Sequence, residues 1–90
     1  MTLMVSIARM SEIPSAAEMP DFHEAHAKVF GACSGLPKIL RDPNDPNQAA
    51  VVAEVHDLDA MRAISRTPEG DAMMRKFGFL EQLSYFLEDA

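Results

Sequence analysis

Residues 36–56 read LPKILRDPNDPNQAAVVAEVH and hold two apolar stretches separated by a turn signal. The signal is Asp42–Gln48 (DPNDPNQ), in which proline fixes the backbone φ angle and Asp and Asn side chains bond to nearby backbone groups. We expect Leu36–Arg41 and Ala49–His56 to be strands that this turn joins into a β-hairpin. Pro37 cannot donate a ladder hydrogen bond, which predicts that it lies on an edge strand or at the strand's start.

Thr2–Met10 (TLMVSIARM) lies upstream of the hairpin and is also expected to be a strand, because it is apolar and has neither Gly nor Pro. Alternation divides its side chains between two faces, with Leu3, Val5 and Ile7 on one and Met4, Ser6, Ala8 and Met10 on the other. Both faces are mostly apolar or small, which predicts that both are covered.

The segment between that strand and the hairpin is predicted to hold a helix. In the connector Ser11–Met19, Ser15 and Glu18 have the spacing of a capping box. Pro20 is tolerated only in the first turn of a helix, so the regular helix should start near it and run towards Cys33, with Gly35 as its stop. One helical stripe is expected to face the core: Phe22, Ala25, Val29, Phe30 and Cys33.

The C-terminal third predicts a helical region in two pieces. Asp57 is expected to cap a helix over Leu58–Arg66, with Leu58, Met61 and Ile64 facing inwards. Thr67 and Pro68 then have the residue types of an N-cap and a first helical position, so they predict a second helix that carries Met73 and Phe77 and ends at Gly78.

A last strand is expected over Phe79–Asp89, with apolar surface from Leu80, Leu83, Tyr85, Phe86 and Leu87. Its acidic residues Glu81, Glu88 and Asp89 are interpreted as a solvated edge that opposes edge-to-edge aggregation.

The predicted order of elements is β-α-β-β-α-β. It indicates an α+β, ferredoxin-like fold: one domain over residues 1–90, with a four-stranded antiparallel sheet and the helices on one face. Hydrophobic residues make up 48% of the chain, which leaves apolar side chains for the other face. We therefore expect a homodimer that forms through the sheet.

Charge and cysteine content exclude several classes of protein. The net charge is −6, from 14 acidic and 8 basic residues, so we expect neither nucleic acid nor a membrane as partner. No apolar run approaches the roughly 18 residues of a membrane span, and Met1–Met10 lacks the basic start of a signal peptide. Cys33 is the only cysteine, which excludes an intrachain disulfide and a thiolate cluster. The expected location is the cytoplasm.

Taken together, the motifs resemble the small dimeric α/β-barrel proteins, the superfamily of the antibiotic biosynthesis monooxygenases. The resemblance covers roughly Leu3 to Glu88. It is carried by Phe22 and His26 four residues apart, Asp45-Pro46-Asn47 before Val51-Val52-Ala53-Glu54-Val55, Asp57-Leu58-Asp59-Ala60, Thr67-Pro68-Glu69, and Tyr85-Phe86-Leu87-Glu88. It implies a dimeric α/β barrel with a ligand pocket between helix and sheet, in a superfamily that includes cofactor-independent oxygenases, haem enzymes and isomerases.

The chain departs from the monooxygenase pattern in two respects. Monooxygenases of this type bring tryptophan and asparagine to the pocket, whereas this chain has no Trp. Asn44 and Asn47 fall in the predicted turn, away from such a pocket. The resemblance therefore supports the architecture more strongly than a particular oxygenation.

His26 is the candidate catalytic residue, because its spacing from Phe22 places an imidazole on the apolar stripe that faces the sheet. The alternative is a core histidine bonded to a backbone carbonyl or to Tyr85. Phe22, His26, Tyr85 and Met61 are the candidate ligand-binding residues.

Other side chains receive more ordinary interpretations. A metal site of His23, His26 and His56 has no supporting motif, so we expect no metal, no organic cofactor and a solvent-exposed His23. Cys33 is expected to be a small buried hydrophobe, and Met4, Met10, Met61 and Met73 to fill gaps in the core.

Two functions remain open from the sequence. The first is a protein that binds an apolar or aromatic small molecule between helices and sheet, with a monooxygenase-like or isomerase-like activity that needs no organic cofactor. The second is a non-catalytic dimeric interaction or accessory module.

Overall fold

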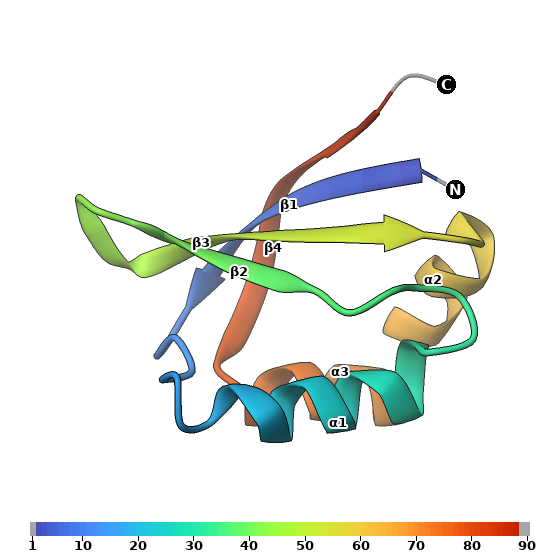
Figure 1. The fold of residues 1–90 in the computed structure, drawn as a ribbon, viewed down its shortest axis with the longest axis horizontal. Coiled ribbons are helices and arrows are strands. Elements are labelled where there is room, and N and C mark those ends of the chain that lie inside the picture. Colours follow the sequence, from blue (N-terminus) through green and yellow to red (C-terminus); the bar gives the residue numbers. More distant parts are fainter. Residues whose placement is uncertain (1, 89–90) are drawn as a thin grey trace.

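The computed structural model describes residues 2–88, and within them it has the predicted ferredoxin-like order, with the second helical region in two pieces. The elements are β1 (Thr2–Met10), α1 (Met19–Phe30), β2 (Lys38–Asp42), β3 (Asp45–Val55), α2 (Leu58–Ser65), α3 (Pro68–Lys76) and β4 (Phe79–Leu87). All three helices lie on one side of the sheet (Figure 1). Asp89, the last residue of the predicted final strand, lies outside the described residues.

The sheet is antiparallel, with strand order β2-β3-β1-β4. β2 and β4 therefore form its edges, as the acidic residues of the last strand predicted. An edge was one of the two positions predicted from Pro37, which lies just before β2. The division of β1 into two faces is also confirmed. Ser6, Ala8 and Met10 are buried on the face covered by the helices, whereas Leu3, Val5 and Ile7 are only partly buried on the open face.

The apolar core lies between the helices and the sheet. Its centre is Phe22, which has no exposed surface and whose ring packs against Phe77 and Phe79 at centroid distances of 5.3 and 5.7 Å. Such tilted aromatic contacts add to the free energy gained by burying apolar area. This packing fixes α1 against the end of α3 and the start of β4.

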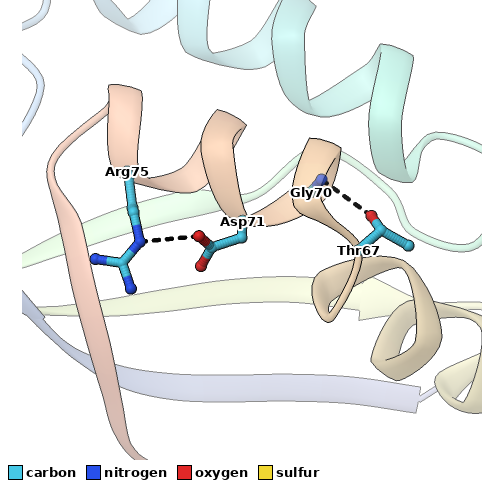
Figure 2. Close-up of polar contacts among 4 residues, drawn as sticks. All are labelled: Thr67, Gly70, Asp71 and Arg75. Carbon is cyan, nitrogen blue, oxygen red and sulfur yellow. Dashed lines mark hydrogen bonds and ion pairs between the residues drawn. The ribbon is translucent and has the colours of Figure 1, made fainter.

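α2 and α3 start at the predicted capping residues, whereas the N-cap of α1, Glu18, makes no side-chain cap bond. The Asp57 carboxylate accepts a hydrogen bond from Ala60 N at 3.0 Å. The Thr67 hydroxyl accepts one from Gly70 N at 3.1 Å, and one turn later Arg75 Nε contacts Asp71 at 2.9 Å (Figure 2). Capping of this kind satisfies amide groups that have no partner inside the helix.

The predicted end of the first helix is wrong. α1 ends at Phe30 rather than near Gly35, and Gly31 caps it with an ordinary negative φ of −59°. The chain turns early because the next residues join the end of β3: Ser34 bridges Val55, and Gly35 N donates to Glu54 O at 2.8 Å. A tertiary contact, not the glycine, therefore stops the helix.

The hairpin strands are also shifted from their predicted limits. β2 starts at Lys38 instead of Leu36, and the connecting turn is only Pro43 and Asn44, so that β3 begins at Asp45 instead of Ala49. Each Asp-Pro-Asn triplet does form the expected local bond, from Asn44 N to Asp42 and from Asn47 N to Asp45, both at 2.8 Å. Only the first triplet reverses the chain, because Asp45 already pairs with Asp42 across the hairpin.

Candidate functional site

A cavity of about 290 Å³ lies between the helices and the covered face of the sheet. Its inner wall is buried and its outer wall is exposed, so it is a pocket with a mouth rather than a sealed void. The inner wall includes Ser6, Ala8, Phe22, His26, Phe30, Ala53 and Phe79. The outer wall includes Arg62, Ser65, Asp71, Leu80, Glu81, Gln82 and Tyr85. Met4, Val51, Leu58, Met61 and Met74 are partly buried between them.

His26 supplies the buried imidazole of this cavity. It lies one helical turn after Phe22 and one before Phe30, and its ring is 5.9 and 5.0 Å from theirs. The side chain is 5% exposed, and its Nδ1 atom has no hydrogen-bond partner among residues 2–88. Buried polar atoms normally have partners, so Nδ1 is an unsatisfied polar atom in a ring that lines the cavity.

Burial also sets the charge of His26. Loss of solvent, together with the smaller effect of nearby His23, lowers the pKa of His26 from 6.5 to about 4. The ring is therefore neutral at pH 7, with one N–H donor and one acceptor nitrogen. This form can bind a ligand hydroxyl or carbonyl and can accept a proton.

Ser6 and Gln82 form a second polar group on the cavity wall. Gln82 Nε2 donates to Ser6 Oγ at 2.7 Å, across the β1–β4 pairing. Neither residue is among those predicted from the sequence. Ser6, a polar residue between the apolar Met4 and Ala8 on the covered face, could have been predicted from the sequence to line the cavity. The position of Gln82 could not, because the register of β4 against β1 shifts twice.

Tyr85 and Arg62 lie together at the mouth. Arg62 Nη2 donates to the Tyr85 hydroxyl at 2.5 Å, and the guanidinium carbon is 5.7 Å from the centre of the tyrosine ring. Arg62 was also missed, because it follows the inward-facing Met61 on α2 and its partner is far away in the sequence.

The structure brings together all four predicted ligand-binding residues, because Phe22, His26, Met61 and Tyr85 line this cavity. Their roles in binding, and the catalytic role of His26, stay predictions. The alternative of a His26 bonded to a carbonyl or to Tyr85 is not found for Nδ1 within residues 2–88, and the Tyr85 hydroxyl is bonded to Arg62.

The remaining candidates lie apart from this cavity. His23 is partly buried and its Nε2 lies 3.1 Å from Pro37 O, so the prediction of an exposed His23 is wrong. His56 is exposed, and over residues 2–88 no group of three His, Cys, Asp or Glu side chains is placed to hold a metal ion.

The other sulfur-containing residues divide between core and cavity. Cys33 is buried, its thiol donates to Phe30 O at 3.3 Å, and burial raises its pKa, which fits the predicted small hydrophobe. Met10 and Met73 fill the core, Met61 packs against it and also lines the cavity, and Met4 lines the cavity. Asn44 and Asn47 do not line it.

Comparison with known proteins identifies the fold but no sequence relative. No family model matches the chain, and no curated protein matches it.

No helix among the described residues is long and apolar enough to cross a membrane.

Several solved structures share the architecture at low sequence identity. One is SnoaB, a cofactor-independent oxygenase from Streptomyces nogalater, with 19% identity, a TM-score of 0.59, and coverage of 99% of this chain and 91% of that one. An antibiotic biosynthesis monooxygenase has 11% identity, a TM-score of 0.55, and coverage of 100% and 98%. The protein YJCS has 5% identity, a TM-score of 0.62, and coverage of 99% and 97%. The expected ferredoxin-like fold of the antibiotic biosynthesis monooxygenases is thus confirmed.

Proposed function

We propose that this chain binds an apolar or aromatic small molecule in the cavity between its helices and sheet, with His26 as the principal polar contact. The observation that carries the proposal is the unpartnered, buried Nδ1 of a neutral imidazole on the wall of a cavity of about 290 Å³. A buried polar atom without a partner costs free energy, and a hydrogen bond gained when a guest binds beside the ring would recover part of that cost.

The size and lining of the cavity indicate the class of guest. A dry apolar cavity of about 150 Å³ can bind benzene, so 290 Å³ corresponds to a molecule of about two fused rings. Phe22, Phe30 and Phe79 offer aromatic contacts, and Met61 offers an adaptable thioether. A phenol-like guest would use both the apolar wall and His26.

We extend the proposal to a monooxygenase-like activity without an organic cofactor. The support is the shared fold with a cofactor-independent oxygenase, together with a neutral imidazole that can take a proton from a bound phenol or activated C–H group. A developing anion beside the ring would raise its pKa and so favour the transfer.

The direct test compares two guests that differ by one hydroxyl. Wild-type protein should bind 2-naphthol more tightly than naphthalene in a fluorescence titration at pH 7. The substitution His26→Leu should weaken the binding of 2-naphthol about tenfold, because a hydrogen bond in a buried site is worth about 1–2 kcal/mol. It should weaken the binding of naphthalene far less. Ala53→Leu, which adds carbon atoms to the inner wall, should exclude both guests.

Exposed His56 provides the matched control, since His56→Gln should leave both affinities unchanged. Thermal unfolding would verify that each variant is folded. Absence of saturable binding of either guest to the wild-type protein would refute the proposal.

We further propose that the chain is a homodimer through the open face of the sheet. Leu3, Val5 and Ile7 of β1 lie on this face, and across the ladder Val52 faces Val5 from β3 while Phe86 faces it from β4. Phe86 is 60% exposed in the single chain. Two such faces packed about 10 Å apart would bury these side chains.

Light scattering after size exclusion would test the dimer. The wild-type chain should elute at twice the mass of one chain, and Phe86→Glu should shift it to the monomer. Leu36→Glu is the control, because Leu36 is equally exposed but precedes β2. A monomeric wild-type protein would refute the dimer.

The second candidate function is a non-catalytic dimeric module. It is favoured by one observation: among the described residues, His26 is the only buried ionisable side chain that lines the cavity. Saturable binding without turnover of naphthols under oxygen would support this candidate over the oxygenase.

A further inference from the structure

Arg62 places a positive charge at the mouth of the cavity, whose inner wall is mostly apolar. It is exposed on α2, and its guanidinium contacts the neutral hydroxyl of Tyr85 on β4. Five N–H groups are available on a guanidinium, and the Tyr85 hydroxyl uses one of them. The remaining donors are free to bind an acceptor that enters the mouth.

The carboxylates at the same mouth have other cations as partners. Asp71 is bound by Arg75 at 2.9 Å, one helical turn along α3 (Figure 2), and Glu81 lies 3.8 Å from Arg9. No ion pair joins Arg62 to any carboxylate of residues 2–88. The mouth therefore carries paired acidic groups and one cation whose partner is neutral.

Tyr85 adds a second donor beside this cation. Its oxygen accepts the Arg62 hydrogen bond, so its own O–H proton remains free to be donated. A guanidinium N–H and a phenolic O–H that lie next to each other match the two oxygens of one carboxylate.

We propose that the guest is an apolar carboxylate, such as an aromatic acid, whose ring system fills the cavity while its carboxylate binds to Arg62 and the Tyr85 hydroxyl at the mouth. This rests on the proposed binding function, and it names the class of ligand. The neutral wall of the cavity supplies contact area for the ring system, and Arg62 at the mouth favours an anionic ligand over a neutral one. This local positive charge matters because the chain has a net charge of −6 and otherwise repels anions.

The test uses two probes of nearly equal shape, 2-naphthoate and its neutral amide 2-naphthamide, titrated by calorimetry at pH 7 and low salt. Wild-type protein should bind the carboxylate about tenfold more tightly than the amide, as expected for charge-assisted bonds at a partly exposed site. Arg62→Gln should abolish that preference while changing the amide affinity less than about twofold. Tyr85→Phe keeps the aromatic ring, and it should lower the affinity for 2-naphthoate about threefold without changing the affinity for 2-naphthamide.

Arg66→Gln is the matched control. Arg66 is exposed, follows α2 and does not line the cavity, so its loss changes the net charge equally but should leave the preference intact. Equal binding of the two probes to the wild-type protein, or an equal loss for both in Arg62→Gln, overturns the carboxylate proposal and leaves the proposed cavity binding standing. If neither probe binds while 2-naphthol does, only the carboxylate proposal is overturned, and if 2-naphthol and naphthalene also fail to bind, both proposals are overturned.

Discussion

Lowering the pH from 7 to 5 should destabilise the fold through His26. The pKa of His26 is lowered to about 4 in the folded chain, against an ordinary 6.5 in the unfolded chain. Between these two values the unfolded state binds more protons, so the stabilisation that is present above pH 6.5 is lost as the pH falls towards 4. At 1.36 kcal/mol per pKa unit, the loss between pH 7 and pH 5 is about 2 kcal/mol.

Water in the mouth of the cavity reduces this value, so we expect about 1–2 kcal/mol in practice. Urea unfolding at both pH values would measure it in the wild-type protein, in His26→Leu and in His56→Gln. The carboxylates titrate in all three proteins, so the difference between variants isolates His26. The part of the pH dependence that His26 contributes should be absent in His26→Leu and should persist in His56→Gln, in which an exposed histidine is lost. An unchanged pH dependence in His26→Leu would refute the reasoning.

Three further predictions concern stability and are read from urea midpoints. Gly78→Ala should cost more than about 1 kcal/mol, because Gly78 has a φ of +96° and a Cβ there would collide with the Glu12 carbonyl; a neutral result would contradict this backbone geometry. Asp57→Ala should cost about 1 kcal/mol by removing the acceptor for Ala60 N, whereas Asp57→Asn should retain most of the stability. Phe22→Ala should cost about 3–4 kcal/mol as a cavity-forming core substitution, and a loss below about 1 kcal/mol would count against its central place in the core.

The features that were predictable from the sequence depend on neighbouring residues. Asp57 and Thr67 cap their helices through bonds to the amides three residues later, so residue type and spacing are enough to predict these caps. His26 was assigned to the covered face because it follows the buried Phe22 by one helical turn. Alternation alone divided β1 between its two faces.

The features that escaped prediction are set by distant parts of the chain. α1 stops at Phe30 because the following residues bridge to Val55, which no local pattern reveals. The polar pairs of the cavity, Ser6 with Gln82 and Arg62 with Tyr85, join residues 76 and 23 positions apart. Both pairs depend on the register of β4, which two irregularities shift against β1.

The measurement that tests the central claim most directly is a long-range ¹H–¹⁵N spectrum of the histidine side chains at pH 7, recorded during addition of 2-naphthol. Before addition, His26 should show a neutral ring. During the titration its nitrogen resonances should move saturably while those of exposed His56 stay in place, because the guest binds to the unpartnered imidazole of the cavity. If saturating 2-naphthol leaves the His26 nitrogens unmoved, the cavity does not bind its guest through this residue and the account is wrong.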